Sequence, residues 1–150
     1  MTVKELKNFL DEADIEADFY EFSEPTLSVE DASRQLGVNP EKIIKSLVFK
    51  DEDDSPVLAI VAGDKRVDED KLSKVHGSRV KMAKARDVEE FSGYKIGEVP
   101  PVSHGLKTII DTEIMDFDSI IAGGGSTHTL VELDPRDIAR ITDAKLAKIS

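Results

Sequence analysis

Two apolar runs separated by a short acidic segment place the strongest constraint on the fold. Residues 43–49 and 57–61 are rich in Ile, Leu and Val, and residues 51–55 between them are polar and mostly acidic. Short runs of branched apolar residues bounded by turn-forming residues are typical of buried β-strands. The sequence therefore predicts a largely buried β-hairpin with strands at 47–49 and 57–61, and it places Lys45 at the junction between the short helix after Pro40 and the first strand.

One charged residue, Lys45, interrupts the first of these runs. A buried ammonium group is unfavourable unless an anionic or polar partner meets it, and lysine is seldom fully buried without one. A lysine can also lay its methylene groups on apolar surface while its charge stays in water. Lys45 is therefore a candidate ligand-binding residue, although the surrounding residues alone leave the second explanation open.

The rest of the chain alternates between helical and strand patterns. Capping signals support several of the helices, including Ser28 before one helix, Gly37 after it, and Asp134-Pro135 before the last. We expect a single α+β domain over residues 1–150, with a mixed, mostly antiparallel sheet of six or seven strands and flanking helices. The predicted helices are 2–13, 29–36, a short one after Pro40, 68–75, 86–91 and a last one across Ile138 and Ile141; further strands are expected around 19–22, 80–82, 108–110, 119–122 and 129–131.

Composition limits the classes of function. Apolar residues make up 39% of the chain, no segment is long and apolar enough to span a membrane, and the acidic first twenty residues lack a signal core. The absence of cysteine excludes a disulfide framework, a thiolate nucleophile and a cysteine metal site. We expect a cytoplasmic protein with no membrane partner.

The charge is unevenly distributed along the chain. The net charge of −11 argues against DNA or general nucleic-acid binding, which normally needs clustered lysine and arginine. Residues 1–41 carry −8 and residues 87–150 carry −6, but residues 42–86 carry +3. Only the middle third, which contains Lys45, could present a surface that attracts phosphate, although solvated helix charges would explain the same count.

Two loops rich in glycine or proline are candidate binding segments. The first contains Gly97, Val99, Pro100 and Pro101, where proline fixes the backbone and removes an N–H donor. In the second, between two predicted strands, three consecutive glycines would let a ligand approach the backbone closely. Each loop, taken singly, could equally be a rigid turn or a flexible hairpin loop. The second loop consists of Gly123, Gly124, Gly125, Ser126 and His128 with their neighbours.

Neither a metal site nor a triad has strong support. His104 and His128 fall in or beside the two loops but lack zinc-ligand spacing, and no serine lies in a nucleophile-elbow pattern. The glycines match no nucleotide-binding fingerprint. We expect no metal and no cofactor.

Taken in order, these motifs resemble the YbaK/ProX family of aminoacyl-tRNA editing domains over about residues 20 to 142. The motifs that carry the resemblance are Leu36-Gly37-Val38, the run from Ile43 to Lys50, Gly63-Asp64 with Arg66 and Asp68, Gly93-Tyr94, Ile96-Gly97, Val99-Pro100-Pro101, Ala122-Gly123-Gly124 and Asp134-Pro135.

The resemblance implies a mixed sheet with flanking helices and an enzyme that hydrolyses the ester of misacylated tRNA, typically cysteinyl- or alanyl-tRNA for proline. It implies that Lys45 is the essential lysine and contacts the acceptor end of the tRNA. The glycine-proline loop, with His104, and the glycine segment, with Ser126 and His128, would form the walls of the substrate pocket. Misacylated tRNA is the implied partner, with prolyl-tRNA synthetase as a further candidate.

Two alternatives remain at this stage. The chain could be a non-catalytic binding module for a tRNA acceptor end, a nucleotide or a protein, since Glu98 and Ser103 stand where related loops often carry glycine. It could also be a metal hydrolase that uses His104 and His128, which would lose activity to chelators.

Overall fold

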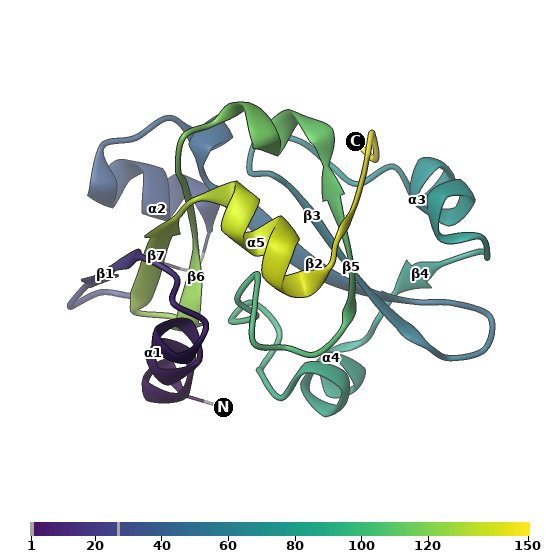
Figure 1. Cartoon of the computed structure of the whole chain (residues 1–150), viewed down its shortest axis with the longest axis horizontal. Coiled ribbons are helices and arrows are strands. Elements are labelled where there is room, and N and C mark those ends of the chain that lie inside the picture. The colour runs from purple at the N-terminus through teal and green to yellow at the C-terminus, as the bar shows by residue number, and fades with distance from the viewer. Residues whose placement is uncertain (1, 27) are drawn as a thin grey trace.

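The computed structural model describes residues 2–26 and 28–150, which form helices and strands in alternation (Figure 1). The order of elements is α1 (Val3–Glu12), β1 (Ala17–Glu21), α2 (Val29–Leu36), the 3₁₀ turn η1 (Pro40–Lys42), β2 (Ile44–Lys50), β3 (Pro56–Ala62), α3 (Glu69–His76), β4 (Lys81–Met82), α4 (Ala85–Ser92), β5 (Lys107–Asp111), the 3₁₀ turn η2 (Thr112–Asp116), β6 (Ile120–Ser126), β7 (Thr129–Leu133), α5 (Pro135–Thr142) and β8 (Lys145–Ala147).

The strands of the described residues form two sheets rather than one. A five-stranded sheet has the order β4-β2-β3-β5-β8, and a three-stranded sheet has the order β1-β7-β6. Four of the six strand pairs are antiparallel, while β3 with β5 and β5 with β8 are parallel. The predicted α+β class is confirmed, with one more strand than expected and a division into two sheets.

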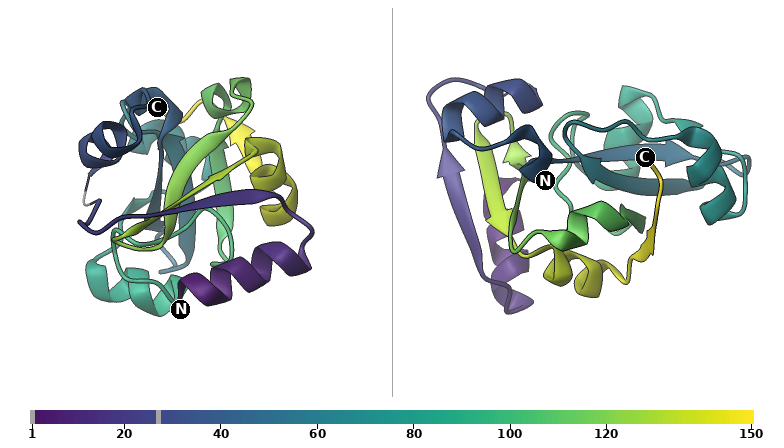
Figure 2. Two further views of the ribbon diagram at one scale, coloured as in Figure 1. Left: turned by 90° about the vertical axis from the view of Figure 1, so that its left-hand side faces the viewer. Right: turned by 90° about the horizontal axis from the view of Figure 1, so that it is seen from above.

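The two sheets meet at the start of β2. An isolated parallel bridge joins Ile43 to Ile121 of β6, and it is the contact at which the small sheet approaches the large one. The right panel of Figure 2 shows the small sheet standing at one end of the large sheet, so that the two do not lie face to face.

Helices cover both faces of the large sheet. One apolar cluster places Leu72 of α3 against Phe49, Val61 and Ile109 on one face. A larger cluster on the other face combines residues of α1, α4 and α5 with residues of both sheets. Because this core is shared between the sheets, it supports the expectation of one domain over residues 1–150, which stays a prediction.

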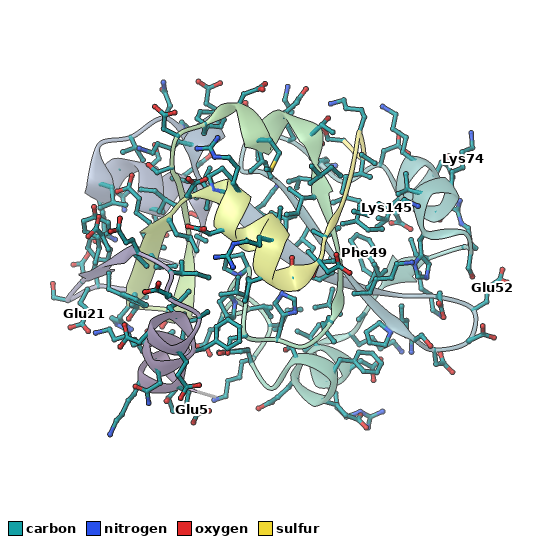
Figure 3. The ribbon with its side chains drawn as sticks, in the orientation of Figure 1. Glu5, Glu21, Phe49, Glu52, Lys74 and Lys145 are labelled. Atoms are coloured by element: carbon teal, nitrogen blue, oxygen red, sulfur yellow. The ribbon has the colours of Figure 1, made fainter. Side chains whose placement is uncertain are left out.

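The predicted helix boundaries agree closely with the structure, for the local reasons expected. The Ser28 hydroxyl accepts from the Asp31 N–H at 3.1 Å, and Gly37 ends α2 with φ of +68°. Asp68 and Asp134 cap α3 and α5 in the same way. Charged side chains such as Glu5, Glu21, Glu52 and Lys74 project from the outer elements, whereas Phe49 lies inside (Figure 3). No helix of the described residues is long and apolar enough to cross a membrane.

The glycine segment belongs to a strand, which corrects the expectation of a loop between strands. Residues 123–126 continue β6 through a β-bulge, and the hairpin turn is confined to Thr127 and His128. Glycine is uncommon in strands except at bulges and where two backbones come close. Both conditions hold here, because a Cβ atom on Gly124 would lie 2.8–3.0 Å from Thr129 of β7.

This close approach makes Gly124 a stability determinant. The change Gly124→Ala should force β6 away from the Thr129 backbone and lower the free energy of unfolding by about 1–3 kcal/mol. Gly123→Ala is the matched control, because its Cβ would meet Val99 O at an ordinary 3.6 Å. Urea unfolding of both variants measures the difference, and equal stability of the two would contradict the steric explanation.

Candidate functional site

A cavity of about 290 Å³ opens along the edge of β2, where the two sheets diverge. Its walls come from residues 43–48, from α2, from the segment between β4 and α4, and from β6. Gly97 and Val99 of the loop after α4 close it on the side opposite α2. Small-molecule sites typically start at about 300 Å³, so the cavity suits a small group rather than a large cofactor.

The structure brings four of the predicted site residues together at this cavity. Lys45, Gly97, Val99 and Gly123 come from three separate segments of the chain, and all four line it. The other predicted site residues do not line it: Pro100, Pro101, His104, Gly124, Gly125, Ser126 and His128.

Lys45 supplies the charge at this site. Lys45 lies within β2 as its second residue, opposite Val61 of β3, because the strand begins at Ile44 and not at Leu47 as the sequence predicts. Its side chain is half-buried. Its Nζ donates to the carbonyl oxygen of Lys65 at 2.5 Å. Burial lowers the pKa of the Lys45 ammonium below its ordinary value; Arg66 lowers it further, and the Asp64 carboxylate acts in the opposite direction. Lys45 is thus neither fully buried nor a freely solvated surface lysine.

The remaining lining residues carry no ionisable side chain. Among the described residues around this cavity, Lys45 is the only ionisable one. Three further residues, Thr26, Ser28 and Ser46, contribute hydroxyl groups. Such a lining can position a polar ligand and stabilise negative charge, but it offers no carboxylate or imidazole to act as a general base.

The glycine-proline loop has the irregular backbone that its sequence predicts. Gly97 has φ of +84°, a conformation that favours glycine. Glu98, which stands where related loops often have glycine, is outside the cavity lining, and its N–H donates to the Lys95 carbonyl at 2.9 Å. The Glu98 side chain therefore leaves the cavity unobstructed.

The second departure from the glycine pattern has a visible backbone consequence. Ser103 adopts φ of +69°, a left-handed conformation in which a side chain is strained and glycine is not. The Tyr94 hydroxyl donates to Ser103 Oγ at 3.2 Å, which helps to hold the serine in this conformation.

His104 braces this loop from within. It is 6% exposed, its Nδ1 accepts from the Leu106 N–H at 3.0 Å, and its Nε2 lies 2.9 Å from the Pro101 carbonyl oxygen. Since Nδ1 accepts, Nε2 carries the proton and donates, so both ring nitrogens of the neutral form are occupied. Burial lowers the pKa of His104, although its bond to Pro101 acts against this.

Ser126 and His128 are involved in the β6–β7 hairpin. Ser126 Oγ lies 2.8 Å from Thr129 Oγ1 and accepts from the His128 N–H at 3.2 Å. His128 itself is exposed, and no group of three or more His, Cys, Asp or Glu residues in the described part of the chain could hold a metal ion. The metal-hydrolase alternative gains no support.

A second, larger hollow of the molecule is strongly acidic. It has a volume of about 1080 Å³ and lies between α1, β1 and α5. Its only basic lining residue is Lys7, and the acidic ones are Asp11, Asp14, Glu16, Asp18, Asp118, Glu132, Asp134 and Asp137.

Several cavity residues could not be found from the sequence. Thr26 and Leu130 are isolated residues in different parts of the chain, and only tertiary packing brings them to one place. Ser46 had one signal, its position next to Lys45 in the apolar run.

Comparisons with known proteins agree on one family. The family model described as an aminoacyl-tRNA editing domain matches residues 23–141. The Enterococcus faecalis protein EbsC, named as a candidate Cys-tRNA(Pro)/Cys-tRNA(Cys) deacylase, is 33% identical over 138 residues, which cover 87% of this chain and 83% of that protein. A proline–tRNA ligase of Thermotoga neapolitana is 33% identical over 113 residues, 73% of this chain but 19% of the ligase.

A solved structure extends this likeness to three dimensions. The crystal structure of a candidate trans-editing enzyme for prolyl-tRNA synthetase superimposes with a TM-score of 0.89 at 26% identity. The match covers 99% of this chain and 96% of that structure, so the arrangement of both sheets is shared.

The environment of His104 predicts how its ring titrates. Because burial lowers the pKa below the ordinary value of 6.5, the folded protein should keep the ring neutral at a pH where the unfolded chain is protonated. The stability that this neutral ring contributes is present above pH 6.5 and decreases as the pH falls below it. Imidazole ¹⁵N NMR over a pH titration should show the Nε2–H tautomer for the neutral ring and a midpoint below 6.5; a ring that titrates at or above 6.5 would contradict this account.

Proposed function

Because the chain belongs to the aminoacyl-tRNA editing domain family, we propose that it hydrolyses the ester bond of misacylated tRNA in trans. The expected substrates carry a small amino acid, such as cysteinyl- or alanyl-tRNA for proline. The observation that carries the proposal is the cavity at the β2 edge, in which Lys45 meets Gly97, Val99 and Gly123.

Lys45 acts as a positioning and electrostatic group in this proposal. An ammonium has three N–H donors, and the Lys65 carbonyl occupies one of them. The others are available to a phosphate of the acceptor end or to the ester oxygen. Since the group is partly desolvated, its attraction for negative charge is stronger than in bulk water.

The absence of a general base among the described lining residues fits ester hydrolysis. An aminoacyl ester is already activated, so a positioned water and a stabilised oxyanion can suffice. Groups held rigidly by a strand and by a glycine-proline loop provide such positioning without a reacting side chain.

The size of the cavity fits selection of small amino acids. Each additional methylene changes binding in an apolar site by only about 1–3 kcal/mol, so a synthetase alone discriminates poorly between small side chains. A second site of about 290 Å³ with mainly apolar walls can accept these small groups and reject larger ones.

A non-catalytic binding module remains the second candidate. It is favoured by one observation, that the lining offers a cation and hydroxyl groups but no acid–base pair. In that case a tRNA acceptor end, a nucleotide or a protein segment would bind at the same cavity without being cleaved. Prolyl-tRNA synthetase is a candidate partner in either case.

Deacylation assays with alanyl-, cysteinyl- and seryl-tRNA test the proposal. The wild type should hydrolyse at least one of them, and Lys45→Ala should reduce its rate about 100- to 1,000-fold, as expected when a group that stabilises the oxyanion is lost. Lys74→Ala is the matched control, since this exposed lysine on α3 is remote from the cavity lining (Figure 3). It should retain wild-type activity.

Two results would refute the proposed hydrolase activity. One is no turnover of any of the three substrates, and the other is full activity of Lys45→Ala. Binding of an acceptor-stem RNA without hydrolysis would instead favour the binding module. In that case the slope of log affinity against log salt concentration would give the number of phosphates that the protein contacts.

A further inference from the structure

The edge of β2 that faces the cavity is open at its centre. β3 pairs with all seven residues of β2 on the opposite edge. On the cavity side, β4 pairs only with Phe49 and Lys50, and β6 pairs with this segment only through the isolated bridge at Ile43, just before β2. Among the residues that the structure describes, no strand pairs with Ser46 on this edge.

The direction of the backbone groups at Ser46 follows from the register. The carbonyl of Ile43 accepts from the Gly63 N–H, so Ile43 directs its backbone groups toward β3. In an antiparallel ladder, alternate residues direct theirs to opposite edges. The carbonyl of Val48 confirms the alternation, because it accepts from the Ala83 N–H on the outer side at 3.0 Å. The N–H and C=O of Ser46 therefore point outward into the cavity.

An open strand edge is a ready-made partner for another extended backbone. In an antiparallel sheet, each narrow pair of residues exchanges two hydrogen bonds, N–H to C=O in both directions. The aminoacyl group of a charged tRNA carries the same two features as such a residue, an α-amino donor and a carbonyl acceptor. It is one residue long, as is the exposed part of the β2 edge.

We propose that the main chain of Ser46 binds the substrate's aminoacyl main chain as one antiparallel β pair. The Ser46 N–H donates to the ester carbonyl oxygen, and the Ser46 carbonyl accepts from the α-amino group. This inference rests on the proposed function and deepens it, because it assigns an oxyanion donor that the side chains of the lining do not supply.

The neighbouring groups fit this arrangement. Lys45 and Ser46 line the same cavity, so the ammonium is available in that cavity to the negative charge that develops on the carbonyl during hydrolysis. Gly97 and Gly123 line the cavity without side chains, which leaves room for the aminoacyl group beside the strand. Recognition through the main chain would accept any small α-amino acid, while the apolar walls would limit its size.

Proline at position 46 tests the N–H directly. Proline removes this donor and is tolerated on strand edges whose N–H faces away from the ladder, and the residue before it prefers the extended conformation that Lys45 already has. Ser46→Ala is the reference, because it removes the same hydroxyl but keeps the N–H. Ser46→Pro should deacylate alanyl-tRNA about 100- to 1,000-fold more slowly than Ser46→Ala, and equal rates in the two folded variants would overturn the inference.

A binding measurement distinguishes this inference from the proposed function. The probe is an alanyl-adenosine in which an amide replaces the ester, titrated into ¹⁵N-labelled wild-type protein. The Ser46 amide should shift downfield as a new hydrogen bond forms, and this result would support the inference even if no tRNA were hydrolysed. The inference would be overturned if the probe did not bind, or if it saturated the protein and left the Ser46 amide resonance unchanged. Neither outcome depends on the activity of the wild type or on the folding of the proline variant.

Discussion

The close packing of Gly63 against the start of β2 sets the geometry on which the rest of the structure depends. Its N–H donates to the Ile43 carbonyl at 2.6 Å, and a Cβ atom there would lie 2.6–2.8 Å from Val29, Ile43 and Pro40. Only glycine allows α2, η1 and the end of β3 to meet so closely. This contact fixes the register that places Lys45 opposite Val61, and it holds Ile43 where β6 can bridge to it.

The division into two sheets follows from the same junction and creates the cavity. If β6 had paired along the whole of β2, the edge would be closed and its backbone groups would be used within the sheet. Instead, the small sheet pairs with this edge only through the bridge between Ile43 and Ile121, and β4 pairs only with the far end of β2. The open part of the strand is thus bounded at both ends by pairing, which fixes its length at about one aminoacyl unit. The two hollows also differ in charge: carboxylates line the larger one, whereas among the described residues that line the β2 cavity the only charged side chain is that of Lys45.

Much of this organisation could be predicted from the sequence, because it is local. The hairpin of β2 and β3, the caps at Ser28 and Asp134 and the irregular loop around Gly97 all follow from residue patterns a few positions long. The family resemblance, now confirmed by the family match, added Lys45 and the two loops as one set.

The features that could not be predicted depend on tertiary contacts. β8 has three residues, two of them exposed, and exists only because β5 offers a parallel edge. The glycines of β6 lack the side chains on which a strand pattern relies. His104 was predicted to contact the substrate, but its two ring nitrogens are both hydrogen-bonded within its own loop. The open edge at Ser46 is a property of three strands that are distant in sequence, so no single segment reveals it.

A crystal structure with the amide-linked alanyl-adenosine tests the central claim most directly, because it locates the aminoacyl end without requiring turnover. The account predicts the alanyl group in the β2 cavity, with its carbonyl beside the Ser46 N–H, the Lys45 ammonium close by, and its methyl group against the apolar wall. A ligand bound elsewhere on the molecule, or one in the cavity with its adenosine at the β2 edge and its alanyl group in solvent, would contradict it.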